Sequence, residues 1–331
     1  MNICFIMDHW SDIKPITDST IRMIHECCKR GHQVFITHAS SVSVKDSQVM
    51  AKCQKIISSK TNGSIPNFYK SVEFECGRIP LVDMDCLFLR SNPPLDQNLL
   101  YFLDYIKHYV FIINSIRGLR SAMNKLYTSS LETSDDRFTP VTYVSKDKEY
   151  IKSIIMESDE ENMVMKPLDG YGGKGVIVIE KAARKNINSL LDFYMDKADQ
   201  FVIIQEYLEG AENGDVRILM LNGKPIGAMK RIPAQGEARS NIHAGGREEK
   251  HKLTLQEKEL CKLIGPKLVE DGLYFVGLDV INGKLLEVNV CSPGGITRIN
   301  KLNNTKLQVK ITDFIEKSVN EFKSLQMNAH E

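Results

Sequence analysis

The sequence predicts an α/β protein, and three observations near its start support this class. Residues 2–7 form a short apolar run, a helical pattern of apolar residues ends at Gly31, and residues 34–37 form a second apolar run. A strand, a helix that stops at glycine and another strand make a β-α-β unit, whose strands run parallel. The N-terminal region is therefore expected to form a small parallel α/β sheet.

Composition bounds the class of protein. The 331 residues are enough for about two domains, or three small lobes. With 26% charged and 42% hydrophobic residues, the chain is neither fibrous nor disordered. Lys+Arg 43 against Asp+Glu 42 gives a net charge of +1, which disfavours nucleic-acid binding. The eight scattered cysteines lack metal-ligand spacing, and the start of the chain lacks a signal or membrane segment, so we expect a cytoplasmic protein.

The rest of the chain continues the alternation of strands and helices. Two prolines after residue 92 end a third strand, because proline cannot donate to a β-ladder. The predicted strands are 86–90, 110–113, 142–144, 163–166 and 176–179, and the predicted helices are 95–108, 146–157, 254–271 and 305–325. A polar stretch suggests a domain boundary between residues 120 and 140.

The strongest local motif is the glycine-rich segment 166–175, which contains Lys166 and Lys174. Four glycines between two β runs let a strand-to-strand loop approach a polyphosphate and present backbone N–H groups to it. The segment fits neither the Walker pattern nor the dinucleotide-binding glycine pattern. A glycine-rich hairpin without a ligand remains the alternative.

Two further segments carry polar residues in suggestive positions. Residues 205–208 end a strand and could offer backbone groups and apolar surface to an adenine ring, although an ordinary strand is the simpler interpretation of that segment alone. Asp215 and Arg217 share one face of a strand, and Arg231 and Arg239 follow it. Guanidinium groups suit phosphate or carboxylate binding, and a solvated basic face is the alternative.

A β-hairpin is predicted over residues 277–289, and its acidic residues could hold a metal ion. Glu287 and Asn289 lie two apart and therefore on one face of their strand. A two-residue turn would put Asp279 on the opposite face, whereas a three-residue turn would bring all three side chains together. We predict the three-residue turn, because three hard oxygen donors on one face suit Mg²⁺ bound to a nucleotide. An edge hairpin with exposed acids is the alternative.

Taken together, these motifs occur in an order that resembles the ATP-grasp superfamily, beginning at Lys125 and ending at the hairpin. Within it the chain resembles the bacterial-type glutathione synthetases from residue 1 to about residue 320, including residues 89–94 and 289–293. The resemblance implies an N-terminal parallel α/β domain at 1–121, a central α/β lid lobe at 122–200 and a C-terminal mixed-sheet catalytic lobe at 201–331.

The resemblance also implies an activity. An ATP-dependent carboxylate–amine ligase would phosphorylate γ-glutamylcysteine, and glycine would attack the acyl phosphate, releasing ADP and phosphate. Mg²⁺ would be the metal, with Mn²⁺ as a second candidate, and the protein would be a homo-oligomer that binds small molecules, with no nucleic acid or membrane partner. The implied residues are Lys125, Lys166, Gly172, Gly173, Gln205, Glu206, Tyr207, Leu208 and Asp215 for ATP; Asp279, Glu287 and Asn289 for metal; Arg217, Arg231 and Arg239 for catalysis; and Asp18, Ser19, Arg90, Arg239, Asn241, Gly245, Gly246, Ser292 and Pro293 for substrate.

Two positions depart from the pattern, and two other functions stay open. Residues 90–92 replace a more usual Lys-Asp pair, and the segment 291–295 carries a second glycine where a longer side chain is common. Both lie in expected substrate-contacting regions. One alternative is another ATP-grasp ligase, such as one that adds glutamate to a protein or peptide carboxylate. The other is a nucleotide-binding protein without catalysis.

Overall fold

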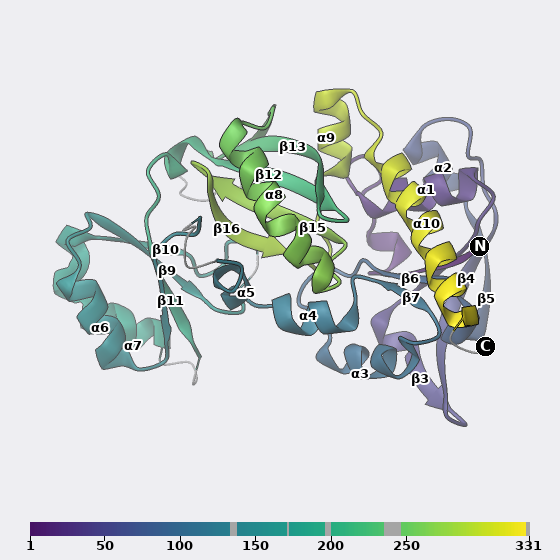
Figure 1. Cartoon of the computed structure of the whole chain (residues 1–331), viewed down its shortest axis with the longest axis horizontal. Coiled ribbons are helices and arrows are strands. Elements are labelled where there is room, and N and C mark those ends of the chain that lie inside the picture. The colour runs from purple at the N-terminus through teal and green to yellow at the C-terminus, as the bar shows by residue number, and fades with distance from the viewer. Residues whose placement is uncertain (133–137, 171, 196–199, 235–245, 329–331) are drawn as a thin grey trace.

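The computed structural model describes residues 1–132, 138–170, 172–195, 200–234 and 246–328. In these residues three β-sheets follow one another along the chain, with seven, four and five strands. The N-terminal sheet lies at one end of the molecule, the four-stranded sheet forms a lobe at the other end, and the C-terminal sheet lies between them (Figure 1).

The N-terminal sheet is mixed, so the prediction of a parallel sheet is correct only for its inner part. Strands β1, β2, β6 and β7 are parallel in the order β2-β1-β6-β7, whereas β3, β4 and β5 are antiparallel additions. The bounds are β1 Asn2–Ile6, β2 Gln33–Thr37, β3 Val42–Lys45, β4 Gln48–Ser58, β5 Glu73–Pro80, β6 Cys86–Leu89 and β7 Phe111–Ile113. Asp46 and Ser47 both have positive φ and form a tight turn between β3 and β4, which only antiparallel neighbours allow.

Helices cover this sheet. The helix predicted before Gly31 is α1 (Thr20–Lys29), and the one predicted over 95–108 is α3 (Gln97–Ile106). The other two are α2 (Ile65–Ser71) and α4 (Ile116–Ala122). Ser115 caps α4 by accepting a hydrogen bond from the Gly118 amide, 3.1 Å away.

The central lobe packs two helices on an antiparallel sheet. Its strand order is β10-β9-β11-β8, with β8 at Thr142–Ser145, β9 at Asn162–Pro167, β10 at Ile177–Glu180 and β11 at Val202–Glu206. Helices α6 (Lys148–Glu157) and α7 (Ile187–Met195) contribute Ile151, Ile155 and Leu191 to a separate small core. Val164 of β9 and Val178 of β10 lie on the opposite face of the sheet.

The C-terminal sheet has the order β14-β13-β12-β15-β16. Its strands are β12 Asp215–Leu221, β13 Lys224–Ile232, β14 Arg247–Lys250, β15 Phe275–Ile281 and β16 Lys284–Asn289. The remaining helices are α5 (Leu126–Ser129), α8 (Leu255–Glu270), α9 (Ile296–Asn303) and α10 (Leu307–Asn328). Thr254 and Glu257 form a capping box that begins α8.

The last helix returns to the first domain. Helix α10 packs along α1 (Figure 1), and its residues Ile311, Ile315 and Val319 are fully buried in one cluster with side chains of β1, β2 and α1. Arg30 binds Asp313 at 2.7 Å and reinforces this contact. The N-terminal sheet therefore shares its core with the C-terminal end of the chain, and the boundaries at 121 and 200 stay a prediction.

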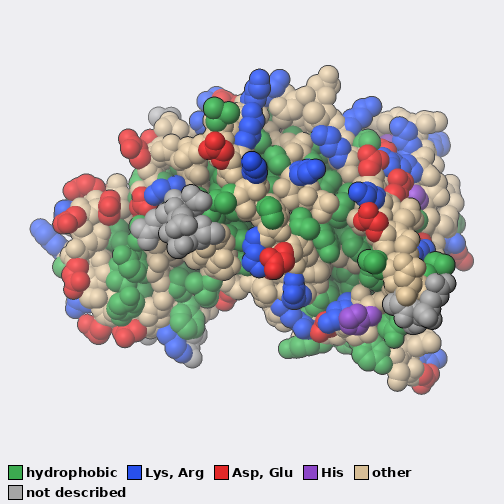
Figure 2. All heavy atoms as spheres, viewed as in Figure 1, with side chains coloured by type: hydrophobic (Ala, Val, Ile, Leu, Met, Phe, Trp, Pro, Cys, Tyr) green, Lys and Arg blue, Asp and Glu red, His purple; other side chains and the backbone are tan. Residues whose placement is uncertain are grey.

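The surface is mixed in charge. Lysine, arginine and acidic side chains are interspersed over the face shown in Figure 2. No helix in the described ranges is both long and apolar enough to cross a membrane.

Asn114 joins the first and last sheets. Its Nδ2 donates to the carbonyl oxygens of Phe275 and Val290, both at 2.8 Å, and its Oδ1 accepts from the Phe275 amide at 2.8 Å. Asn114 is buried, so these groups have no access to bulk water. The side chain thus positions β15 and the segment that follows β16.

We expect Asn114→Ala to destabilise the protein by about 3 kcal/mol, because it leaves three buried backbone groups of Phe275 and Val290 without partners. Urea denaturation measures the change. The exposed Asn98 makes no such contact, and Asn98→Ala should alter stability by less than about 0.5 kcal/mol. Equal stabilities of the two variants would show that the bonds of Asn114 are replaced by water.

Candidate active site

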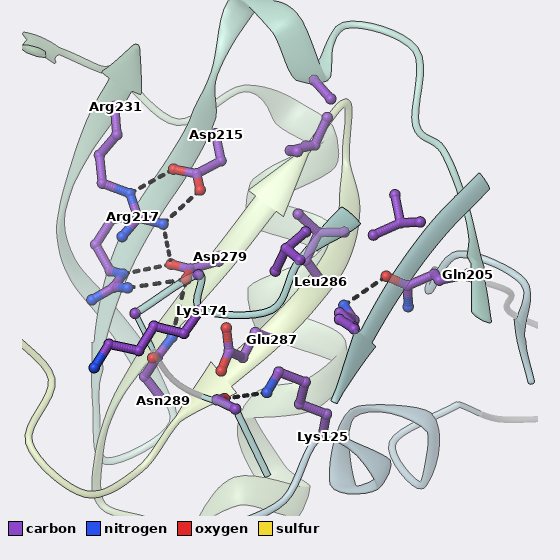
Figure 3. A pocket seen from close by; sticks show the side chains of 18 of the residues that line it. Lys125, Lys174, Gln205, Asp215, Arg217, Arg231, Asp279, Leu286, Glu287 and Asn289 are labelled. Carbon is purple, nitrogen blue, oxygen red and sulfur yellow. Dashed lines mark hydrogen bonds and ion pairs between the residues drawn. The ribbon is translucent and has the colours of Figure 1, made fainter. Parts of the chain in front are cut away.

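A cavity of about 430 Å³ lies between the central sheet and the C-terminal sheet (Figure 3). Residues predicted from scattered motifs meet there. The lining includes Lys125, Lys166, Gly172, Gly173, Gln205, Glu206, Tyr207, Leu208, Asp215, Arg217, Arg231, Asp279, Glu287, Asn289 and Ser292. All the residues predicted for ATP and metal, and two of the three catalytic arginines, therefore line one space.

Two lysines stand on the side of the cavity nearest the glycine loop. Lys125, just before α5, donates from Nζ to the Gly170 carbonyl oxygen. Lys166 on β9 donates from Nζ to Oε1 of Gln205 at 2.8 Å, and Gln205 in turn donates to Oγ1 of Thr142 at 2.8 Å. Both ammonium groups are thereby held in place before any ligand arrives.

Lys166 is an unusually acidic lysine. Burial lowers the pKa of Lys166 to about 8, with the charge of Lys125 acting in the same direction and Glu287 opposing it. Burial also lowers the pKa of Lys125. A nearby anion would offset the cost of burying these two ammonium groups, so the lysine pair favours a negatively charged ligand.

The glycine loop lies between two strands, β9 and β10, as its sequence predicted. Gly172, Gly173 and Gly175 have φ values of 65°, 73° and 74°, which residues with a side chain rarely adopt. At Gly170 a Cβ would lie 2.6 Å from the ring of Pro167. The loop can therefore lie flat against the cavity and expose its backbone.

Residues 205–208 border the other end of the cavity, where an ion pair joins two lobes. Both carboxylate oxygens of Glu206 accept from Nζ of Lys284 at 2.9 Å, and one also accepts from the Val141 amide at 3.1 Å. This contact fixes the end of β11 against the tip of the C-terminal hairpin.

Sequence reasoning missed the apolar walls of the cavity. These walls include Val164, Val178, Ile281 and Leu286. Val164 could have been found, because it lies two residues before Lys166 and shares its face of β9. Leu286 could not, since its orientation depends on a β-bulge.

The hairpin turn differs from the prediction. Ile281 pairs directly with Lys284, so the turn has two residues, Asn282 and Gly283. Their φ values of 48° and 75° are those of a tight hairpin turn that needs two left-handed residues, and Asn-Gly is its preferred sequence. The predicted three-residue turn is wrong.

A β-bulge nevertheless brings the acids together. The register shifts between Asp279 and Val280: Val280 pairs with Leu285, but Asp279 pairs with Glu287, which leaves Leu286 as the extra residue. Directly opposed residues of an antiparallel pair point to the same face. Asp279 and Glu287 therefore share a face, as predicted. The bulge at Leu286, and not a three-residue turn, produces this arrangement.

The carboxylate of Asp279 is fully engaged. Its Oδ1 accepts from Arg217 Nε at 2.5 Å and lies 2.9 Å from Arg231 Nη2, and its Oδ2 accepts from Arg217 Nη2 at 3.0 Å and from Asn289 Nδ2 at 3.2 Å. A carboxylate has about four acceptor positions. Burial alone would raise the pKa of Asp279, but the two arginines outweigh it and hold that pKa below its usual value.

Asp215 completes the network on the far side of Arg231. Its two oxygens accept from Nε and Nη2 of Arg231, both at 2.6 Å. Burial raises the pKa of Asp215, and the nearby charge of Asp279 adds to the increase. Asp215 thus orients a guanidinium that lines the cavity, although it was predicted as an ATP contact.

The carboxylate of Glu287 differs from that of Asp279 in its hydrogen bonding. Within the described part of the chain its carboxylate accepts no hydrogen bond, and it lies on the cavity wall near Lys125 (Figure 3). Burial raises the pKa of Glu287, and the charge of Asp279 raises it further. Asn289 donates from Nδ2 to Asp279 and to the Gly277 carbonyl, so its Oδ1 is the atom left for a ligand.

The donor set fits a divalent metal ion. Free oxygens of Glu287 and Asn289 and the carboxylate of Asp279 are the hard ligands that Mg²⁺ prefers. A metal bound to Asp279 would have to replace or share one of its four contacts. The described residues hold no group of three His, Cys, Asp or Glu side chains able to bind a metal by themselves.

The residues predicted for substrate binding divide into three sets. Ser292 lines the cavity, whereas Asp18, Ser19, Arg90, Pro293 and Gly246 are not among its lining residues. Arg90 lies in a buried seam, where it donates to Thr20 and Pro293, and its Nη1 has no partner among the described residues. Burial lowers the pKa of Arg90 to about 10. The third set, Arg239, Asn241 and Gly245, lies outside the described residues.

Comparisons with known proteins point to one family over nearly the whole chain. Residues 1–120 match the family model of the prokaryotic glutathione synthetase N-terminal domain, and residues 124–304 match that of its ATP-grasp domain. A glutathione synthetase from Thermosynechococcus vestitus is 34% identical over 319 residues, which is 93% of this chain and 97% of the relative. One from Synechocystis sp. is 35% identical over 326 residues, covering 96% and 99%.

Solved structures show the fold. A D-cycloserine synthetase aligns with a TM-score of 0.67 at 13% identity, covering 97% of this chain and 100% of its own. The D-alanine–D-alanine ligase of Coxiella burnetii aligns with a TM-score of 0.63 at 10% identity, covering 100% and 98%. The ATP-grasp fold expected from the order of the motifs is confirmed.

Proposed function

We propose specific roles for the cavity residues on the premise that the chain belongs to the prokaryotic glutathione synthetase family. As a member it is an ATP-dependent carbon–nitrogen ligase. The phosphates of ATP would lie between Lys125, Lys166 and the glycine loop. The adenine would lie against residues 205–208 and the apolar walls of the cavity.

The reaction would join γ-glutamylcysteine and glycine. An oxygen of the peptide carboxylate attacks the γ-phosphorus of ATP, and ADP leaves, giving an acyl phosphate. The glycine amine then attacks the acyl carbon, loses a proton and expels inorganic phosphate. No side-chain nucleophile is needed, so the work of the protein is positioning and charge stabilisation.

Arg217 and Arg231 are the best-supported groups for that stabilisation. Arg217 donates from Nε and Nη2 to Asp279, and Arg231 donates from the same two atoms to Asp215. Nη1 of each arginine has no partner among the described residues. A guanidinium fixed by a carboxylate does not have to reorganise when negative charge develops on the phosphoryl group. Arg239 stays a third proposed member.

Glu287 and Asn289, with Asp279, would hold Mg²⁺, or Mn²⁺ in its place. Such an ion neutralises phosphate oxygens when bound. The protein contribution is the free Glu287 carboxylate and the Asn289 oxygen, which Asp279 orients through Nδ2. The remaining proposed substrate contacts are Ser292 in the cavity and the seam of Asp18, Ser19, Arg90 and Pro293.

The observation that carries the proposal is the convergence of Lys125, Lys166, Arg217, Arg231 and Glu287 on one cavity. ADP release should be measured with ATP, Mg²⁺, γ-glutamylcysteine and glycine, omitting each acceptor in turn. We expect release to require both, with glutathione detected by mass. If γ-glutamylcysteine and glycine do not support ADP release but other amino acids or peptides do, these two substrates are refuted. The ligase assignment would still stand.

The titration of Lys166 gives a pH test. Only the protonated ammonium attracts phosphate, so kcat/KM for ATP, which reports the free enzyme, should fall as pH rises through about 8. Lys166→Arg should remove this limb, because a guanidinium stays protonated. The exposed Lys185→Arg is the control and should keep it. A wild-type profile that stays flat to about pH 9.5 would contradict the role of Lys166.

We also propose a compartment and an assembly state. All eight cysteines are free, which suits a reducing cytoplasm. A homo-oligomer is proposed from the family resemblance alone, and light scattering of the purified protein tests it by mass.

A further inference from the structure

Gly294 lies on the cavity wall in the segment between β16 and α9. Its φ is outside the left-handed region, and a Cβ built on it would meet no heavy atom within 4 Å. Its neighbour Gly295 differs on both counts: φ is +115°, and a Cβ would lie 3.1 Å from Cε of Met229. Backbone geometry therefore requires glycine at 295 and does not require it at 294.

The segment before Gly294 is fixed to the N-terminal domain. Ser292 donates from Oγ to the Arg90 carbonyl oxygen at 3.1 Å, and Arg90 donates from Nη2 to the Pro293 carbonyl oxygen at 3.2 Å. These contacts leave the backbone before Gly294 little freedom to move into the cavity.

The segment after Gly294 is fixed as well. Oγ of Ser19 accepts from the amides of Gly295 and Ile296, both at 3.2 Å, at the start of α9. The backbone on both sides of Gly294 is thus fixed, and a side chain at this residue would project into open space.

This space adjoins the phosphate end of the cavity. The Cβ position of Gly295 lies 3.9 Å from Cγ of Arg217, and both Arg217 and Gly294 line the cavity. The attacking amine must come within about 3–3.5 Å of the acyl carbon, which is itself bonded through one oxygen to the transferred phosphorus. Because Gly294 is bonded to Gly295 and lines the same cavity, an amine bound at this end would lie on the same side of the cavity as Gly294.

Resting on the proposed function, we infer that Gly294 sets the size limit of the amine substrate and leaves room for a substituent on its α-carbon. Small α-amino acids such as L-alanine and L-serine are then ligated as well as glycine. The bonds formed and broken are the same: the amine nitrogen joins the acyl carbon, a proton leaves the nitrogen, and phosphate departs.

The test compares amines in the wild type, Gly294→Ala and Gly294→Val. With ATP, Mg²⁺ and γ-glutamylcysteine, kcat/KM is measured for glycine, L-alanine and L-serine from ADP release and product mass. We expect the wild type to use all three, and each substitution to lower kcat/KM for alanine and serine at least about tenfold more than for glycine. The control is Gly77→Ala, at an exposed position on β5 with ordinary φ, where the ratios should not change.

Other results would overturn the inference in distinguishable ways. If glycine is ligated but the wild type rejects alanine and serine, or if Gly294→Ala lowers all three amines equally, Gly294 does not set the limit. If it instead changes the preference between γ-glutamylcysteine and γ-glutamylalanine, the space belongs to the peptide. Failure of glycine itself to support ADP release would refute the proposed function, and this inference with it.

Discussion

Glu287→Gln should abolish ATP turnover and leave the fold at least as stable as that of the wild type. The amide keeps the shape of the side chain but cannot supply the negative oxygens that a metal ion requires, so we expect kcat/KM to fall about a thousandfold. Stability should behave in the opposite way. Because burial and Asp279 raise the pKa of Glu287, its ionisation destabilises the folded state once the pH exceeds about 4.3.

Turnover by ADP release and the melting temperature, both at pH 7, check this expectation. The exposed Glu259 on α8 provides a matched control, and Glu259→Gln should change neither quantity. Substantial activity of Glu287→Gln at saturating Mg²⁺ would contradict the metal role. A large loss of melting temperature would show instead that Glu287 stabilises the structure.

Asp279→Asn should lower both activity and stability. The carboxylate is the common acceptor of Arg217 and Arg231, and its replacement leaves a buried guanidinium network short of one negative charge. Removing one partner of a buried ion pair typically costs about 3–5 kcal/mol. Since Arg217 also loses the carboxylate that orients it, while Asp215 still holds Arg231, kcat/KM should fall at least about a hundredfold.

Urea denaturation at two pH values separates the charge effect from packing. The pKa of Asp279 in the folded protein lies below its unfolded value of about 3.9, so its contribution is complete above that value and is lost as pH falls through the folded pKa. The stability difference between wild type and Asp279→Asn should therefore be largest near neutral pH and shrink below about pH 4. A difference that does not depend on pH would mean that shape, and not charge, is what Asp279 supplies.

Much of this fold could be predicted because its signals are local. Periodicity located the β-α-β unit, and the glycine-rich sequence correctly predicted a loop between two strands, β9 and β10. The strand positions of Asp215 and Arg217 correctly put both on one face, since alternation along a strand is a property of the backbone.

The failures have physical causes that sequence patterns do not contain. The Asn-Gly turn has the two-residue form that its sequence prefers. The bulge at Leu286 depends instead on how β15 and β16 pair. Asp279 was therefore predicted on the correct face, but from an incorrect turn length. The antiparallel strands β3 to β5 were not predicted: a tight turn joins β3 to β4, whereas β5 pairs with β4 across the intervening segment 59–72. The full engagement of Asp279 by two arginines also depends on tertiary geometry.

The return of α10 to the first domain has a consequence for synthesis of the chain. The core around β1 and α1 includes Ile311, Ile315 and Val319, which are synthesised about two hundred residues after β7. Translation adds roughly 5–20 residues per second, so the apolar face of α1 stays without α10 for on the order of 10–40 s after β7 has been synthesised. During that interval the nascent N-terminal domain exposes a surface that chaperones can bind, and its folding is complete only when the helix arrives.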